Sequence, residues 1–351
     1  MRSWRHILAL TCFVISALLL VCPVAAAASS EPEPTLPSAG GPPAAPTVVP
    51  ATAAPATEAT PEEEISEVTV EAPEPRFAAP TLRDRIGRIW APVLINGHGP
   101  YRLVLDTGAT HSAIIPRVVD KLGIPVSALS TIRVTGVTGT AVVPTIAVKR
   151  FEFGELSVDS SVLPVVADVF GGAEGVLGTE GLSDKRIKID FAHDTVVILR
   201  SRGALDTAGV ATLPLRQLRD HLLSLDIRVA NVRAKAIIDT GAQITIGNTA
   251  LRNVLMRHNP KDMQKAEVQG VTLDVTSGDS MRAPPIYVGP LIFQGMNITY
   301  GDMYIFDRWK LNDEPVLVLG MDVLGTVDLL VIDYRLHQLQ MRLRRSAGTR
   351  S

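Results

Sequence analysis

The chain has 351 residues and a formal net charge of −2, from 34 basic and 36 acidic side chains. This near-neutral balance gives no electrostatic basis for binding nucleic acid, which proteins usually contact through a basic surface. Hydrophobic residues make up 46% of the chain, enough for a sizeable core, and the length predicts two domains or one large one.

The first 28 residues have the three parts of an export signal. Basic side chains precede an apolar run at residues 7–21, and a stretch of alanines follows it. The run is shorter than the roughly 20 residues that a membrane span needs. We therefore expect residues 1–28 to be a cleaved signal peptide and the protein to be periplasmic or secreted. An uncleaved N-terminal anchor and lipidation at Cys22 are the alternatives. Cys12 and Cys22 are the only cysteines, so cleavage would leave no cysteine chemistry.

Residues 29–80 are expected to form a disordered tether. The segment is dominated by Pro, Ala, Thr, Ser and Glu. Such a composition lacks the apolar periodicity needed to offset the entropy of ordering the chain. An inhibitory pro-segment is the alternative.

Beyond the tether the sequence changes character. Short runs rich in Val, Ile and Leu alternate with Gly, Asn, Asp and Pro, which is typical of strands joined by turns. Only residues 213–225 and 249–258 have helical spacing over any length, and we expect helices or helical turns there. The pattern predicts an all-β protein, which we divide into an N-terminal lobe at 81–205 and a C-terminal lobe at 206–345.

An internal repeat supports this division. Residues 103–109 read LVLDTGA and residues 236–242 read AIIDTGA, 133 positions later (236 − 103). Three further elements recur in the same order: Gly-Val-Thr at 136–138 and 270–272, Val-Leu-Gly at 176–178 and 318–320, and a strand at 187–191 and 330–334. One such match could be accidental, but four in the same order indicate a duplicated unit.

The repeated motifs resemble those of the aspartic proteases, and those of the retropepsin-like branch most closely. As in retropepsins, alanine follows each Asp-Thr-Gly, at Ala109 and Ala242. The resemblance covers roughly residues 85–343. It implies an all-β fold of two retropepsin-like lobes that form a bilobal cleft, with one aspartate from each lobe. Because both half-sites lie in one chain, a monomer is expected.

The resemblance implies that Asp106 and Asp239 are the catalytic pair. Two adjacent carboxylates cannot both ionise easily, so they share one proton. One acts as a base toward a water molecule while the other polarises the scissile carbonyl. The expected function is an aspartic endopeptidase that cleaves an extended peptide or unstructured protein segment, with no metal and no cofactor. A non-catalytic peptide-binding or structural envelope protein on the same fold is the alternative.

The residues that follow each aspartate are expected to support the loop. Gly108 and Gly241 remove side chains where backbone must approach the carboxylates. The resemblance implies that the hydroxyls of Thr107 and Thr240 bond across to the opposite lobe.

Two segments match the flap hairpins of the family in their distance from the aspartates. They are residues 135–140 and 268–277, and flaps close over a bound peptide and exclude water. Gly136, Gly139 and Gly270 are the glycines that we expect to bind substrate there. Ordinary surface hairpins are the alternative.

Other sites are weakly indicated. The seven histidines are scattered, without the spacing of a zinc motif. We expect His111 to be a solvated side chain near the first loop. Asp190 and Asp333 recur between the two copies, and we expect them to have structural roles at strand ends.

Overall fold

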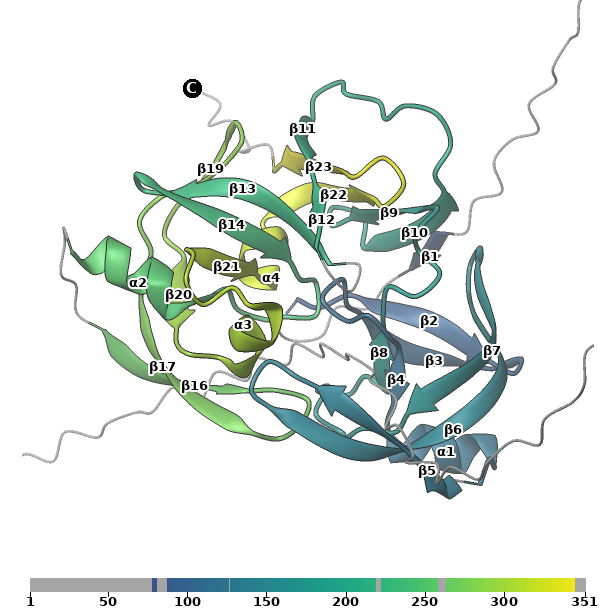
Figure 1. Ribbon diagram of the computed structural model, residues 1–351. Helices are drawn as coiled ribbons and strands as arrows, with labels where there is room; N and C mark the ends of the chain where they lie inside the picture. Colours follow the sequence, from purple (N-terminus) through teal and green to yellow (C-terminus); the bar gives the residue numbers. More distant parts are fainter. Residues whose placement is uncertain (1–77, 81–86, 126, 219–221, 258–262, 345–351) are drawn as a thin grey trace, which may run out of the picture. The chain divides into compact units, whose positions relative to one another are not determined.

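The computed structural model describes residues 78–80, 87–125, 127–218, 222–257 and 263–344. Most of the described residues lie in strands, which form three sheets, so the predicted β-rich character is confirmed (Figure 1). The predicted signal peptide, most of the predicted tether and both cysteines lie outside the described residues. Within the described ranges, no helix has the length and apolar character that crossing a membrane would require.

A seven-stranded sheet carries the first aspartate, and we call residues 87–180 the first lobe. Its order is β4-β8-β3-β2-β6-β5, with β7 paired to β6. The strands are β2 (Trp90–Ile95), β3 (His98–Leu105), β4 (Ala113–Ile114), β5 (Ser127–Thr135), β6 (Thr140–Phe153), β7 (Leu156–Pro164) and β8 (Gly175–Leu177). Helix α1 (Pro116–Leu122) begins with a proline, whose fixed φ suits a first turn, and ends at Gly123 in the left-handed conformation.

A ten-stranded sheet carries the second aspartate, and we call residues 215–324 the second lobe. Its order is β16-β17-β20-β15-β21-β14-β13-β18-β19, with β12 paired to β13. The strands are β12 (Arg216–Gln217), β13 (Leu223–Val229), β14 (Val232–Ile238), β15 (Ile246–Gly247), β16 (Gln264–Gln269), β17 (Val275–Arg282), β18 (Ile286–Val288), β19 (Leu291–Phe293), β20 (Asn297–Tyr300) and β21 (Val316–Leu319). The helices are α2 (Thr249–Met256), α3 (Tyr304–Trp309) and α4 (Met321–Leu324).

The two lobes repeat one local arrangement. In the first lobe, β3 pairs in parallel with β8, which pairs antiparallel with β4. In the second lobe, β14 pairs in parallel with β21, which pairs antiparallel with β15. Leu103–Leu105 and Ala236–Ile238 are all buried, as expected for strands covered on both faces. Each buried strand ends directly before one of the repeated aspartates.

A six-stranded sheet contains strands from both halves of the chain. Its order is β1-β10-β9-β22-β23-β11. The strands are β1 (Ala78–Pro80), β9 (Lys185–Asp190), β10 (Thr195–Arg200), β11 (Ala211–Pro214), β22 (Val327–Asp333) and β23 (Gln338–Leu343). The fully buried Asp333 accepts hydrogen bonds from Arg186 Nε on β9 and from Ser201 Oγ, both at 2.7 Å. Asp333 therefore links the two halves, whereas Asp190 accepts bonds from the following turn at Ala192 and His193.

One predicted helix is wrong and one is confirmed. Residues 213–218 and 222–225 contain the end of β11, the short β12 and the start of β13 instead of a helix, and residues 219–221 lie outside the described residues. Pro214 disfavours a helix there, and Leu213, Leu223 and Leu225 are buried residues of the strands. The predicted helix at 249–258 is present as α2, and Asn248 caps it by accepting a hydrogen bond from Leu251 N at 2.9 Å.

Candidate active site

Each aspartate is fixed at the end of its central strand. The backbone N–H of Asp106 donates to Leu177 O at 3.0 Å, and that of Asp239 donates to Leu319 O at 3.1 Å. Leu177 and Leu319 belong to the two Val-Leu-Gly elements, so the repeated motifs that the sequence places 70 to 80 residues apart meet at the site. The two aspartates therefore occupy equivalent positions in the two sheets.

The carboxylates accept hydrogen bonds from the turns that follow them. Gly108 N donates to Asp106 Oδ1 at 2.8 Å. Gly241 N and Ala242 N donate to Asp239 Oδ1 at 2.9 and 3.0 Å. Asp106 is 0% exposed and Asp239 is 1% exposed, so solvent has no direct access to either side chain in this conformation. Bonds of this kind hold a carboxylate in a fixed orientation.

The two Asp-Thr-Gly loops lie against each other. A Cβ added at Gly108 would lie 2.6 Å from Asp239 Cγ, and one added at Gly241 would overlap the carboxylate of Asp106. Any larger residue would therefore push the opposite aspartate away. The glycines bring each backbone loop up to the carboxylate of the other lobe, as expected from the sequence.

The two threonines form a reciprocal set of bonds between the lobes. Thr107 Oγ1 donates to Ile238 O at 2.8 Å and accepts from Thr240 N at 3.1 Å. Thr240 Oγ1 donates to Leu105 O at 2.7 Å and accepts from Thr107 N at 3.1 Å. Both threonines and the two residues whose carbonyls accept their bonds are buried, and an unmade hydrogen bond is costly in a buried position. This set holds the two aspartate loops in register.

The two predicted flaps are hairpins (Figure 1), and hydrogen bonds join their tips. The first turns at Gly136–Gly139, where Gly136 N donates to Gly139 O at 2.8 Å. Thr138 Oγ1 accepts from Gly270 N at 3.1 Å and donates to Asp274 O at 2.8 Å in the second flap. Thr138, which was not predicted from the sequence, is therefore the residue that bridges the flap tips.

A valine at each flap tip is buried. Val137 is 1% exposed and belongs to an apolar cluster of the second lobe that includes Phe306 and Ala242, next to Asp239. Its carbonyl accepts a hydrogen bond from Ile305 N at 3.1 Å. Val271, 3% exposed, lies against Gly136 of the opposite flap. Both hairpin tips are therefore packed against neighbouring residues in this conformation.

Two acidic residues support the aspartate loops and were missed from the sequence. Glu180 and Asp322 each lie two positions after a Val-Leu-Gly glycine. Glu180 Oε1 accepts from Ser112 N at 2.6 Å. Asp322 accepts from Thr245 N at 2.9 Å and from Thr245 Oγ1 at 2.7 Å. Ser112 and Thr245 each lie six positions after a repeated aspartate. Glu180 and Asp322 therefore occupy equivalent positions in the two copies of the repeat, and this equivalence is the sequence signal that could have identified them.

The two supporting acids differ in how many hydrogen bonds their carboxylate oxygens accept. Asp322 also accepts from Val323 N at 2.9 Å, whereas Glu180 Oε2 is buried without a hydrogen-bond partner among the described residues. Burial raises the pKa of both carboxyl groups, against the lowering effect of their hydrogen bonds. Each acid therefore holds its proton to higher pH than an exposed carboxyl would.

Two further side chains, Tyr334 and His111, lie near the site. Burial raises the pKa of the Tyr334 phenol, and the nearby charge of Asp106 raises it further, so this hydroxyl is neutral. His111 is exposed, as expected, and its Nδ1 lies 2.9 Å from Thr110 Oγ1. Among the described residues, no three His, Cys, Asp or Glu side chains are grouped as metal ligands.

Residues 91–180 match the family model described as aspartyl protease. The match contains Asp106, the first flap and the first Val-Leu-Gly element, so the first part of the chain contains a retropepsin-like aspartyl protease domain. It does not extend to Asp239, whose assignment depends on the internal repeat and the geometry above. No curated protein is similar enough to the chain to count as a match.

Proposed function

We propose that the protein is an aspartic endopeptidase with Asp106 and Asp239 as its acid–base pair. The observation that carries the proposal is the reciprocal bonding of Thr107 and Thr240, which holds two Asp-Thr-Gly loops of one chain against each other. The aspartyl protease match over residues 91–180 supports the same reaction class, hydrolysis.

The chemistry follows from two buried carboxylates that share one proton. The ionised carboxylate removes a proton from a water molecule, and the oxygen of that water attacks the scissile carbonyl carbon. The protonated carboxyl donates to the carbonyl oxygen. When the tetrahedral intermediate collapses, the roles exchange, and the departing amine receives a proton. Because the proton belongs to the pair, neither role is assigned permanently to Asp106 or to Asp239.

The substrate that we propose is an extended peptide or an unstructured protein segment. Flap hairpins can bond to an extended backbone as an additional strand would, and side-chain pockets then give specificity. Opening the flaps requires breaking the bonds of Thr138 to Gly270 and Asp274. Substrate binding is thus expected to replace the contacts between flaps with contacts to the peptide.

We further propose that the protein acts outside the cytoplasm as a monomer. The N-terminal sequence pattern supports export, and the presence of both aspartate loops in one chain supports the monomer. N-terminal sequencing of the mature protein should find a start close to Ser29. A chain that retains Met1, or one with a lipid on Cys22, would contradict this export proposal.

The direct test is incubation of the full-length protein with a diverse peptide library, with products identified by mass spectrometry. The endopeptidase should generate internal cleavages that the Asp106→Asn variant does not generate. A wild-type protein that binds library peptides but cleaves none would instead support the non-catalytic alternative. Cleavage at an unchanged rate by the variant would show that the proposed acid–base pair is wrong.

A further inference from the structure

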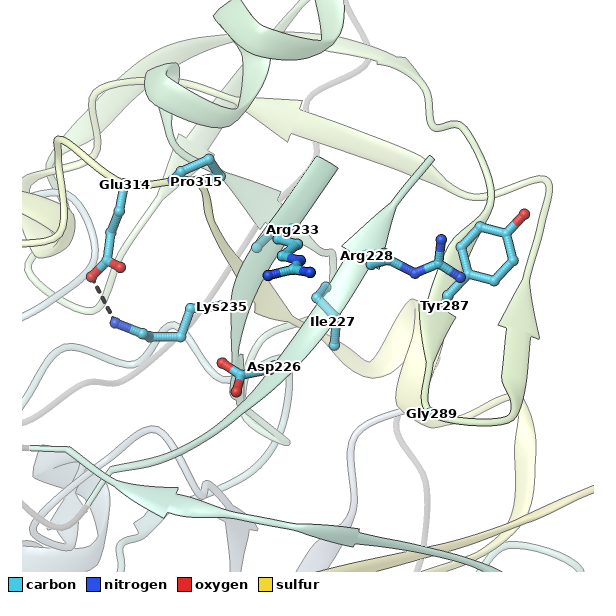
Figure 2. A pocket seen from close by; sticks show the side chains of 10 residues that line it. Asp226, Ile227, Arg228, Arg233, Lys235, Tyr287, Gly289, Glu314 and Pro315 are labelled. Carbon is cyan, nitrogen blue, oxygen red and sulfur yellow. Dashed lines mark hydrogen bonds and ion pairs between the residues drawn. The ribbon is translucent and has the colours of Figure 1, made fainter. Parts of the chain in front are cut away.

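A cavity of about 580 Å³ lies on the second lobe (Figure 2), and neither aspartate lines it. It is lined by the β13–β14 hairpin, by Tyr287 and Gly289 beside the β18–β19 turn, and by Glu314 and Pro315 before β21. None of these residues belongs to an Asp-Thr-Gly loop or to a flap. The cavity is therefore a separate feature of the surface.

Two arginines of this cavity have no acidic partner in the part of the chain that the structure describes. Lys235 Nζ pairs with Glu314 Oε1 at 2.6 Å, as Figure 2 shows. Asp226 pairs with Arg216, which lies outside the cavity, at 2.9 Å. Within each pair, the positive and the negative side chain neutralise each other. Among the described residues, no carboxylate is paired with Arg228 or Arg233, so the cavity has an uncompensated positive charge.

The fold places these two arginines side by side. Arg228 on β13 and Arg233 on β14 are direct cross-strand partners, so their side chains leave the same face of the hairpin. Like charges directly opposite each other destabilise a sheet. The guanidinium of Arg228 lies over the ring of Tyr287, with Cζ 4.6 Å from the ring centroid, which holds it at the cavity. The second lobe thus maintains a charge repulsion that a bound anion would relieve.

The first lobe has no arginine at the position equivalent to Arg233. Arg233 lies six positions before Asp239, and the residue six positions before Asp106 is Pro100. The arginine pair is therefore not required by the repeated architecture. This difference favours a binding role over a structural one.

We propose that this cavity is an exosite that binds a carboxylate-rich segment of the polypeptide substrate. The ligand class follows from the two guanidinium groups, which bind carboxylates through pairs of parallel hydrogen bonds. That the segment belongs to the substrate rests on the proposed endopeptidase function. Strand β14 leads from Arg233 to Asp239, a path of about 20 Å at ~3.3 Å per residue. An extended substrate therefore needs roughly six or more residues between its cleavage point and its acidic segment.

The first experiment measures binding without turnover. Full-length protein with Asp106→Asn is titrated into a fluorescein-labelled peptide that contains a run of glutamates, and anisotropy is recorded. Adding Arg228→Ala and Arg233→Ala should weaken binding at least tenfold. A matched control removes two exposed cations of the six-stranded sheet region, with Lys188→Ala and Arg202→Ala, and should bind within twofold of the parent. Binding by the parent should weaken as salt is raised.

A charge reversal separates binding from folding. Arg233→Glu turns the like-charged pair into an ion pair with Arg228, so it should maintain or raise stability to urea while it abolishes peptide binding. Unchanged peptide affinity in either arginine variant would overturn the proposal. So would equal affinity for a peptide with glutamine in place of glutamate, or full displacement of the peptide by an equimolar concentration of inorganic phosphate.

The exosite and the endopeptidase activity can fail separately. If the library experiment finds no cleavage but the arginine-dependent binding is observed, the cavity still binds acidic polypeptide and the proposed function is wrong. If cleavage is observed and the arginine variants bind normally, the exosite is wrong. In an active enzyme, the double alanine variant should raise KM for an acidic substrate and leave kcat unchanged.

Discussion

The first and second lobes are most alike at their Asp-Thr-Gly loops and least alike at their outer hairpins. Each supplies an Asp-Thr-Gly loop, and each bonds to the other lobe through its threonine. The flap threonines are less alike, because Thr138 bridges the flaps while the buried hydroxyl of Thr272 has no hydrogen-bond partner among the described residues. The outer hairpins differ most, with Pro100 in one lobe and Arg233 in the other.

The increase in difference from the aspartate loops to the outer hairpins has a physical reason. A residue that contacts its counterpart across the interface must satisfy two buried lobes at once, so few alternatives are tolerated. A residue on an outer hairpin faces solvent, where substitutions usually change stability little. The repeated parts are therefore candidates for the shared chemistry, and the divergent parts are candidates for recognition by one lobe.

The largest expected effect tests whether the two aspartates are equivalent. Asp106→Asn and Asp239→Asn should each lower kcat by roughly 10³-fold or more, because either change removes the shared proton and one acid–base partner. Circular dichroism and urea unfolding would verify that both variants are folded. If one variant kept near-normal kcat, the lobes would not contribute equally and the pair would have to be reassigned.

The next effect tests the symmetry of the cross-lobe bonds. Thr107→Val and Thr240→Val preserve shape but leave a buried N–H and a buried C=O unpaired. Each should lower the free energy of unfolding by about 2–4 kcal/mol, and the two losses should be similar. Thr131→Val, at an exposed position of β5, is the matched control. A loss below 1 kcal/mol for either buried threonine, measured from urea midpoints, would mean that the bonds contribute little.

A smaller effect concerns the flap valines. Val137→Ala and Val271→Ala each remove two buried methyl groups, which corresponds to about 1.6 kcal/mol of burial. The loss should appear mainly as easier flap opening, because both side chains are at hairpin tips. Hydrogen exchange of Ile305 N–H, which donates to Val137 O, should accelerate in Val137→Ala. Unchanged exchange at that amide would contradict a closed flap held by Val137.

The smallest effect concerns the unequal supporting acids and depends on pH. The pKa of Glu180 is raised in the folded protein, so the unfolded chain loses this proton at lower pH. The contribution of Glu180 is therefore most favourable below its unfolded pKa and declines as pH rises toward its folded pKa. Urea midpoints from acidic to neutral pH should fall less steeply for Glu180→Gln than for wild type. Parallel curves would show that Glu180 does not titrate differently on folding.

The sequence was enough to predict the aspartate loops and the flap hairpins, because short motifs determine both and the repeat supplies each twice. Glu180 and Asp322 were missed, although both copies place an acid two residues after the Val-Leu-Gly glycine. An isolated acid in a loop usually indicates only solvent exposure. The hydrogen bond that makes Glu180 informative joins it to Ser112, 68 residues earlier in the chain.

Two other features depended on the three-dimensional arrangement. Residues 213–225 were predicted as a helix because leucine spacing alone does not distinguish a helix from strands buried in two different sheets. The arginine pair was not predicted because Arg228 and Arg233 become neighbours only through the register of the β13–β14 hairpin. Pairing that depends on register or on distant strands is not specified by local spacing.

The most direct test of the account is whether one chain supplies both halves of the active site. Purified Asp106→Asn and Asp239→Asn proteins are each assayed alone and then mixed over a wide range of concentrations. If each site forms within one chain, every site in the mixture lacks one aspartate, and cleavage stays at the level of the separate variants. If cleavage returns on mixing and increases with concentration, the intact lobes of two chains have combined, and the account of a single-chain site is wrong.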